Sequence, residues 1–251
     1  MIPLHSSTLP ERSRYVGLLS ELSEAKLNSA EFNLADRLGS LLGFSGSITL
    51  AGALRNLAKG AVGSSVDNVK TLQADVLDIR EKCLKSIAYS FDGKVIEGQL
   101  TVPSNVIGTR EEVLKTYEPY RRFYIAHQVE MSANIDNLRV RVRAGLAGFS
   151  PSLAQLAELD SLFEQSFEVE SRNLFSTTTK LLEHRFKRLL AGHEGKANDY
   201  DDISKNWVMK GQWLDLFYQE MRELLLAEFD VRLQPVLGLL EALNEQVDIS
   251  L

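Results

Sequence analysis

Two long helical patterns, separated by one short break, constrain this chain more than any other feature. The break is Gly148-Phe149-Ser150-Pro151. Before it, mostly apolar side chains recur at steps of three and four residues, which places them on one stripe of an α-helix. The members of this stripe are Tyr120, Tyr124, His127, Met131, Ile135, Leu138, Val142 and Leu146. Because the connection is so short, the two helices are expected to run antiparallel as a hairpin.

The second arm begins at Ser150, which suits the N-cap position, and Pro151, which suits the first helical position. Its expected inward seam repeats every seven residues, with further apolar residues between the repeats. The seam consists of Leu156, Phe163, Glu170, Thr177 and His184, interleaved with Leu159, Phe167, Leu174 and Leu181. Each arm has about 30 to 40 residues, which predicts a rod of roughly 45 to 60 Å.

Reflecting the first arm through residue 150 predicts which side chains meet. His127 falls opposite about residue 173, within one turn of Glu170. We predict that His127 and Glu170 form a partly buried polar pair inside the seam, where such a pair would fix the register. A catalytic acid–base role for the pair would require a cleft, which the pattern does not indicate.

Three alternate arginines, Arg139, Arg141 and Arg143, form one basic cluster on the first arm. They spread over about 200° of helix surface, so they do not make one narrow phosphate-binding face. The reflected hairpin brings them near Glu158 and Asp160 of the second arm. This favours a structural ion-pair network over nucleic-acid binding.

A second basic cluster lies beside aromatic residues at the start of the first arm. Mixtures of arginine and aromatic side chains are typical of interface hot spots. The candidate interaction surface is Tyr117, Tyr120, Arg121, Arg122 and Tyr124. The alternative is that the aromatic rings pack inward while the arginines are merely solvated.

The chain divides into three predicted parts. Residues 1–89 form an N-terminal module of short helices, with amphipathic patterns over 8–27, 29–42, 48–59 and 64–88. Residues 90–110 form a linker, because Gly93, Gly98, Pro103 and Gly108 interrupt any regular helix. Residues 111–251 contain the hairpin and a last helix over about 211–247, in which Pro235 is expected to cause a kink. The predicted fold class is therefore all-α.

Composition limits the classes of function. The 251 residues are 44% hydrophobic and 25% charged, which is typical of a soluble globular protein. With a net charge of −6, no overall electrostatic field favours binding to nucleic acid or anionic lipid. The single Cys83 excludes an intramolecular disulfide and favours a reducing compartment. With neither a secretory h-region nor a long apolar run, a cytoplasmic protein without membrane insertion is expected.

The common catalytic and cofactor signatures are absent from the sequence. GxxxxGK[ST], GxGxxG, GxSxG and HExxH do not occur, and the four histidines are not at metal-ligand spacing. The acidic loop 192–206 contains Asp199, Asp201 and Asp202, which we interpret as a solvated cluster rather than a cation site. We expect no cofactor and no enzymatic activity.

Several longer strings resemble a known family. They are YRRFYIAHQ, SPSLAQLAELD, LLEHRF at 181–186 and LLLAEFDVRLQPVLGLLEAL at 224–243. The chain resembles a proteobacterial family catalogued as domain of unknown function 3348, most closely over about 117–246. The resemblance implies no activity. Members are associated with gene neighbourhoods that encode MotA/TolQ-like and OmpA-like membrane proteins, which implies a cytoplasmic accessory role beside an envelope complex.

Together these observations predict a non-enzymatic helical scaffold that binds another protein, such as a cytoplasmic coiled coil of an envelope complex. Long apolar stripes also make a homodimer a reasonable expectation. Two alternatives stay open. One is a nucleic-acid-associated helical protein that uses its arginine clusters. The other is an enzyme with an unrecognised site, for which His127 and Glu170 are the first candidates.

Overall fold

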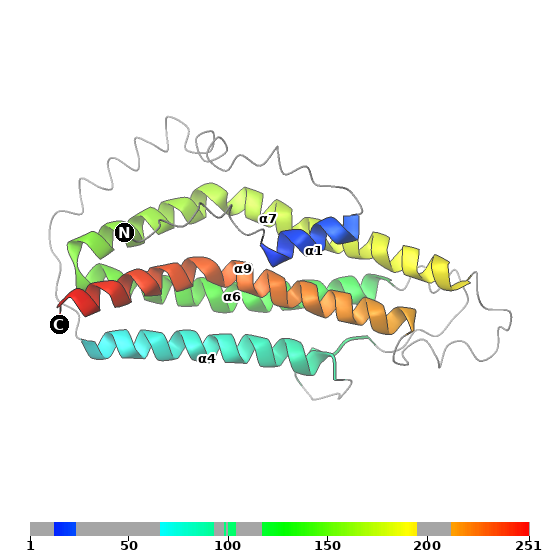
Figure 1. Ribbon diagram of the computed structural model, residues 1–251, viewed down its shortest axis with the longest axis horizontal. Helices are drawn as coiled ribbons and strands as arrows, with labels where there is room; N and C mark the ends of the chain where they lie inside the picture. Colours follow the sequence, from blue (N-terminus) through cyan, green and yellow to red (C-terminus); the bar gives the residue numbers. More distant parts are fainter. Residues whose placement is uncertain are drawn as a thin grey trace, which may run out of the picture.

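The computed structural model describes residues 13–23, 66–92, 98, 100–103, 117–194 and 212–250, and this part of the chain contains five α-helices and no strand. The helices are α1 (Arg14–Ser23), α4 (Val66–Ser90), α6 (Tyr117–Phe149), α7 (Pro151–Glu194) and α9 (Trp213–Ser250). The four longer ones lie along a common axis and make an elongated bundle (Figure 1). The all-α class is confirmed.

The predicted hairpin is present as α6 and α7, with Ser150 alone between them. The Ser150 hydroxyl accepts a hydrogen bond of 3.3 Å from the Leu153 amide, as an N-cap should, and Pro151 is the first residue of α7. The Ser150 carbonyl already accepts the first helical hydrogen bond, at 2.9 Å from Ala154. This local chemistry ends one helix and begins the next within one residue.

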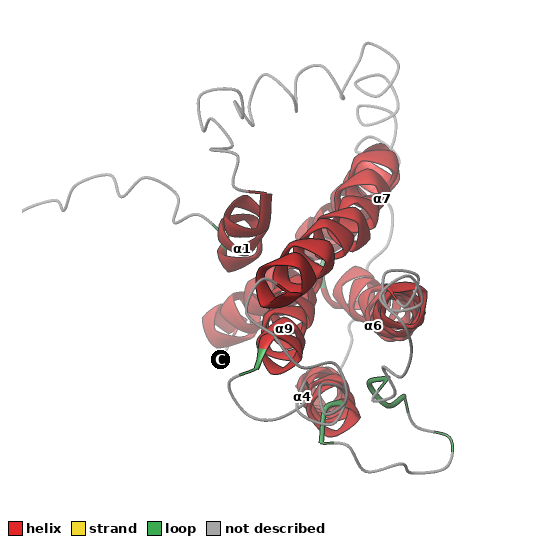
Figure 2. Cartoon of the chain, turned by 90° about the vertical axis from the view of Figure 1, so that its right-hand side faces the viewer, coloured by secondary structure: helices red, strands yellow, loops and turns green. Residues whose placement is uncertain are grey.

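Helix α9 lies at the centre of the bundle, and the end-on view of Figure 2 shows α1, α4, α6 and α7 around it. A helix with so many neighbours needs a wide apolar face. Its buried apolar residues are Trp213, Leu214, Phe217, Tyr218, Met221, Leu224, Leu225, Ala227, Phe229, Leu233, Val236, Leu239 and Leu243. The helix continues through Pro235, and the kink expected there stays a prediction.

Helix α4 packs against α6 and α9 and runs antiparallel to α6. In the polar contacts between the two helices, residue numbers decrease along α6 while they increase along α4. In order they join Arg141 to Asp75, Asn134 to Cys83, Glu130 to Ser86 and His127 to Ser90. Gly145 permits a close approach of the two helices, because a Cβ at this position would overlap the Leu72 side chain.

Part of the predicted linker is bound to the bundle. The Val102 amide donates a hydrogen bond of 2.8 Å to the Ser90 carbonyl, and the Tyr218 hydroxyl donates one of 2.6 Å to the Pro103 carbonyl. The division at 89 and 110 stays a prediction, although α1 and α4 contribute to the same core as the helices after the linker. The helices predicted over 29–42 and 48–59 lie outside the described residues.

The seam predicted for the second arm is right at Leu156 and Leu181, which pack against the core, but it is wrong at its polar members. Its predicted members Glu170, Thr177 and His184 are exposed on α7. The residues that α7 buries are Leu153, Ala157, Thr178, Thr179, Leu182, Phe186 and Leu190. They recur mainly at steps of four rather than seven, and they are absent from the middle of the helix, where residues 168–174 are all exposed. Helix α7 therefore has two separate buried segments, one near each end, and not the single continuous seam that was predicted.

Candidate functional site

Glu228 of α9 is a carboxylate without exposed surface, and four helices meet around it. The Tyr124 hydroxyl donates a hydrogen bond of 2.9 Å to Oε2, and the Gln128 amide nitrogen lies 3.0 Å from both carboxylate oxygens. Arg232, one turn further along α9, donates to Oε1 from Nε at 2.9 Å and from Nη2 at 2.6 Å. A buried charge with this many donors is fully compensated.

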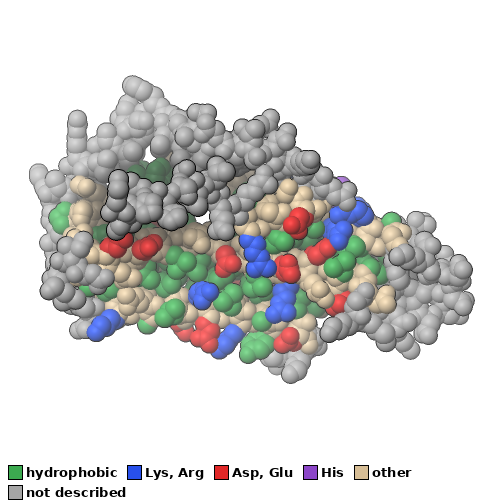
Figure 3. All heavy atoms as spheres, in the orientation of Figure 1, with side chains coloured by type: hydrophobic (Ala, Val, Ile, Leu, Met, Phe, Trp, Pro, Cys, Tyr) green, Lys and Arg blue, Asp and Glu red, His purple; other side chains and the backbone are tan. Residues whose placement is uncertain are grey.

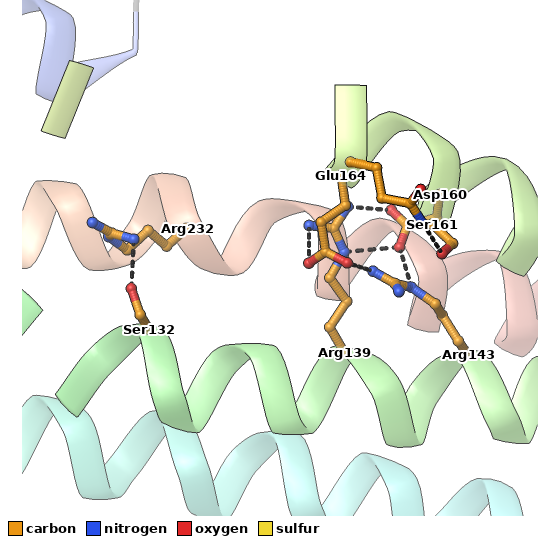
Figure 4. Close-up of polar contacts among 8 residues, drawn as sticks. Ser132, Arg139, Arg143, Asp160, Ser161, Glu164 and Arg232 are labelled. Atoms are coloured by element: carbon orange, nitrogen blue, oxygen red, sulfur yellow. Dashed lines mark hydrogen bonds and ion pairs between the residues drawn. The ribbon is translucent and has the colours of Figure 1, made fainter. Parts of the chain in front are cut away.

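Helices α1 and α7 complete the cluster. The Tyr15 hydroxyl forms a short hydrogen bond with the Thr178 hydroxyl and lies 3.5 Å from Glu228 Oε2. The Arg232 guanidinium lies over the Phe175 ring, 3.6 Å from its centroid, and donates a 2.8 Å hydrogen bond to the Ser132 hydroxyl (Figure 4). We call Tyr15, Tyr124, Gln128, Thr178, Glu228 and Arg232 the Glu228 cluster.

The electrostatics of the Glu228 cluster keep its tyrosines protonated. Burial raises the pKa of Tyr15 and of Tyr124, and the negative charge of Glu228 raises both further. Both phenols therefore stay donors to the carboxylate. Because Glu228 has no exposed surface, a substrate could reach it only after local unfolding. The arrangement is suited to fixing the relative positions of α1, α6, α7 and α9.

The predicted pair of His127 and Glu170 does not form. His127 is 1% exposed, its Nε2 lies 3.0 Å from the Ser90 hydroxyl of α4, and Glu170 is exposed on α7. The predicted register was nearly right, since the adjacent Gln128 donates a 3.1 Å hydrogen bond to the Phe175 carbonyl of α7. The predicted helix face was wrong. Consecutive helical residues point about 100° apart, so Gln128 faces α7 while His127 faces α4.

Burial also determines the chemistry of His127. Its ring packs edge-on against Phe123, with centroids 4.8 Å apart, and burial lowers the pKa of His127 to about 4. The imidazole is therefore neutral at physiological pH. Cys83 is equally enclosed, and burial raises the pKa of its thiol to about 11, which makes it unreactive.

The predicted ion-pair network between the hairpin arms is confirmed. Arg139 and Arg143 of α6 contact Asp160 and Glu164 of α7 (Figure 4). Burial opposes the ionisation of Asp160, but the hydrogen bonds from the two arginines outweigh it and lower the pKa of Asp160. Two details of the prediction are wrong. Glu164 takes the place of Glu158, and Arg141 contacts Asp75 of α4 at 2.5 Å.

The predicted interaction surface is not exposed as a unit. Tyr117, Tyr120 and Tyr124 are buried, whereas Arg121 and Arg122 are exposed and pair with Glu118 of their own helix. The tyrosines recur at steps of three and four, so they share the inward face of α6, and residues 121 and 122 fall on other faces. The rings of Tyr117 and Tyr120 belong to an aromatic core formed with Phe186, Phe217 and Tyr218, whereas Tyr124 belongs to the Glu228 cluster.

Sequence reasoning missed Glu228 altogether. A signal was present, because Glu228 stands between apolar neighbours such as Leu225 and Phe229 in a strongly apolar helix, with Arg232 four residues later. An acid on the apolar face of a helix and an arginine at the i+4 position together predict a compensated buried charge.

A surface cavity of about 540 Å³ lies beside α4. Its lining residues are Asp78, Glu81, Lys82, Lys85, Ser86, Tyr89, Gly98, Leu100 and Glu130. The charges have both signs, and Lys85 pairs with Glu81 at 2.5 Å, so the cavity selects no particular ligand charge. Within the described residues, no group of three or more His, Cys, Asp or Glu side chains is placed to hold a metal ion. Residues 195–206 of the predicted acidic loop lie outside the described part.

None of the described helices combines the length and the apolar character needed to cross a membrane.

Comparison with known proteins places the chain in a family. No curated protein and no solved structure is significantly similar to this chain. One family, described as Protein of unknown function (DUF3348), matches residues 1–245. The match includes the helices that build the hairpin, the ion-pair network and the Glu228 cluster. The chain therefore belongs to the DUF3348 family of proteins of unknown function.

Proposed function

We propose that this protein is a non-enzymatic helical scaffold that binds a helix of another protein. The observation that carries the proposal is the middle of α7, residues 168–174, where seven consecutive side chains are exposed. Val169 in this stretch is 61% exposed and Leu174 is 40% exposed. A helix that is accessible on every face, and that presents apolar side chains, is suited to pairing with a further helix.

The exposed stretch is anchored on both sides. Before it, Asp160 and Glu164 hold α7 to α6, and after it Thr178 and Leu182 are fully buried. Figure 1 shows α7 arched along its length. The middle of α7 is thus a preorganised helix whose accessible surface does not depend on the unfolding of any other part.

The chemistry of the interior supports a scaffold rather than an enzyme. Glu228, His127 and Asp160 are each engaged with neighbouring helices and are buried or nearly so. Their polar atoms are used to hold the bundle together. Catalytic groups, by contrast, must face a cleft that a substrate can enter.

Nucleic-acid binding receives less support. The side chains of Arg139 and Arg143 are only 15% and 14% exposed and are neutralised by Asp160 and Glu164. On the face seen in Figure 3, acidic and basic side chains are intermixed. A phosphate backbone instead requires a continuous basic surface.

The gene neighbourhoods implied by the family resemblance suggest the class of partner. We propose a cytoplasmic helix of a MotA/TolQ-like membrane protein. In this stretch Glu168 pairs with Arg172, and Glu170 is the remaining acid beside Val169, so the partner helix should combine an apolar stripe with a basic residue near Glu170.

Site-specific photocrosslinking in the native host tests this proposal. A photoreactive amino acid replaces Val169, and the control replaces the exposed Ala191 further along α7. We expect an adduct with a MotA/TolQ-like protein in the membrane fraction from position 169 and none from position 191. The proposal is overturned if position 169 yields no such adduct, or if both positions yield the same products.

A further inference from the structure

The outward face of α6 carries a second apolar stripe, separate from the one that packs into the core. Its members are Ala126, Val129, Ala133, Val140, Ala144 and Ala147. Val129 is 64% exposed and Val140 is 60% exposed, among the most exposed large apolar side chains of the described residues. Ala126, Ala133, Val140 and Ala147 recur every seven residues, which is the spacing of a helix–helix seam.

Helices α4 and α7 occupy the two flanks of this stripe. On one flank Arg139 and Arg143 contact α7, and on the other flank Glu130 and Arg141 contact α4. Helix α9 lies on the opposite side of α6, where Tyr120 and Tyr124 contact Tyr218 and Glu228. No helix in the described part of the chain lies over the stripe, and all six members are small or β-branched.

We propose that this face binds a second copy of the chain, with the two α6 helices antiparallel about a two-fold axis between residues 136 and 137. The argument is self-complementarity, which a two-fold interface requires. In this register Val129 lies opposite Ala144 of the second copy, and Val140 lies opposite Ala133. Each larger side chain then meets a small one, so the two helices can approach closely.

Other registers fit less well. Moving the axis half a heptad toward the C-terminus opposes Val140 to itself. Moving it half a heptad toward the N-terminus opposes Ala133 to itself and Val129 to the polar Asn137. The register about residues 136 and 137 also opposes Ala126 to Ala147, so it matches the whole length of the stripe. A stripe of 22 residues corresponds to roughly 32 Å of paired helix.

Asn137, Glu130 and Arg141, three polar residues along the stripe, are compatible with this pairing. The Asn137 side chain is exposed and lies across from Asn137 of the second copy, where two amides can exchange hydrogen bonds. Glu130 and Arg141 share one flank, so antiparallel pairing brings Glu130 of one copy toward Arg141 of the other. Asp136 lies on the other flank, across from Asp136 of the second copy, so two carboxylates approach each other there. Burial and the nearby Glu164 raise the pKa of this carboxyl, which favours its neutral form, whereas Arg232, Arg139 and Arg143 lower it.

Sedimentation equilibrium of the full-length chain tests the proposal with a matched pair of variants. Val140→Glu places a carboxylate at the seam, and Val169→Glu makes the same change at an equally exposed valine of α7. We expect the wild type and Val169→Glu to dimerise in the micromolar range, as roughly 30 Å of paired helix supports, and Val140→Glu to bind at least about tenfold more weakly. Circular dichroism checks that each variant stays helical.

The same variants separate this proposal from the partner-binding function. With the photoreactive amino acid placed at the exposed Asn173, one turn from Val169 on α7, Val169→Glu should abolish partner crosslinking and leave the dimer intact, whereas Val140→Glu should break the dimer. The dimer proposal is overturned if the wild type stays monomeric up to about 200 μM, well above the concentrations at which standard interfaces assemble. It is also overturned if Val140→Glu, still helical, dimerises as the wild type does.

Cysteine crosslinking tests the register. Asn137→Cys alone should give a covalent dimer with a short bismaleimide, because the position lies next to its own copy. Ala126→Cys alone should not react with itself, but a mixture of Ala126→Cys and Ala147→Cys chains should crosslink. The native Cys83 is 2% exposed, so the wild type serves as the background control. Efficient self-crosslinking of Ala126→Cys, or none of Asn137→Cys, would contradict the antiparallel register.

Discussion

The Tyr124 hydroxyl donates a hydrogen bond of 2.9 Å to the carboxylate of Glu228, which has no exposed surface. The two residues lie on α6 and α9, and this contact is part of a cluster that also joins α1 and α7. The bundle thus has a charged group at its centre, where a hydrophobic core would be expected. Its energetic role follows from how completely Glu228 is paired.

Removal of the Glu228 carboxylate should destabilise the whole bundle. Glu228→Ala leaves the Arg232 guanidinium, the Tyr124 hydroxyl and the Gln128 amide without their common acceptor. We expect the free energy of unfolding to fall by about 3–5 kcal/mol, as for other broken buried ion pairs. Urea denaturation followed by circular dichroism measures it.

The control for this variant is Glu223→Ala on the same helix. Glu223 is 54% exposed and lies 4.0 Å from Arg14, so its removal should cost less than about 0.5 kcal/mol. Equal denaturation midpoints for Glu228→Ala and Glu223→Ala would show that the Glu228 cluster contributes nothing to stability.

Loss of the Tyr15 hydroxyl should loosen α1 selectively. Tyr15→Phe keeps the ring, which packs 5.7 Å from Phe175, but removes the hydrogen bond to Thr178. We expect local opening of α1 to become easier by about 1–2 kcal/mol, the cost of leaving a buried hydroxyl partner unsatisfied. Hydrogen exchange should quicken over residues 16–23 and stay unchanged in α4. A uniform acceleration in both helices would contradict a local role.

His127 should make the protein less stable in acid. Its folded-state pKa of about 4 lies below the ordinary value near 6.5, so the unfolded state binds the proton more tightly. The stabilising contribution is complete above pH 6.5 and is lost as the pH falls toward 4. The loss should reach about 3 kcal/mol.

Urea denaturation at pH values between about 7 and 4 tests the role of His127, since this interval spans both pKa values. His127→Gln should flatten the decline in stability relative to the wild type, because the glutamine does not titrate. His184→Gln alters an exposed histidine of α7 and should leave the decline unchanged. If both variants decline as the wild type does, His127 is not the group responsible.

The partly buried ion pairs of Asp160 and the exposed pair of Glu168, all on α7, should differ in strength. The Asp160 side chain is 12% exposed and accepts hydrogen bonds from Arg139 and Arg143, so Asp160→Asn should lower the free energy of unfolding by about 1.5–3 kcal/mol. Glu168→Gln removes the exposed pair with Arg172 and should cost less than about 0.5 kcal/mol. Thermal denaturation of the two variants and the wild type at low and high salt distinguishes the two kinds of pair, because salt screens an exposed pair more than a buried one. A salt-sensitive loss in Asp160→Asn would indicate a solvated pair instead.

The sequence by itself determined the local structure and much of the order along the chain. The apolar spacing of α6, the cap at Ser150 and the short break predicted an antiparallel hairpin, and the reflected register brought Arg139 and Arg143 to Asp160. These features depend on residues that are close in the sequence and on one short connection that reverses the chain. Apolar spacing, capping residues and short connections can all be recognised in the sequence.

Only the tertiary structure decided which neighbour each helix face meets. His127 lies on the predicted stripe of α6, yet it faces Ser90 of α4 rather than α7, and the seam assigned to Glu170 is exposed. Periodicity shows which residues share a face, but it does not show which of several helices covers that face. Glu228 is the clearest case. Its partner Arg232 lies four residues away on α9, but Tyr15 and Tyr124 come from α1 and α6, and no local pattern joins residues so far apart in the chain.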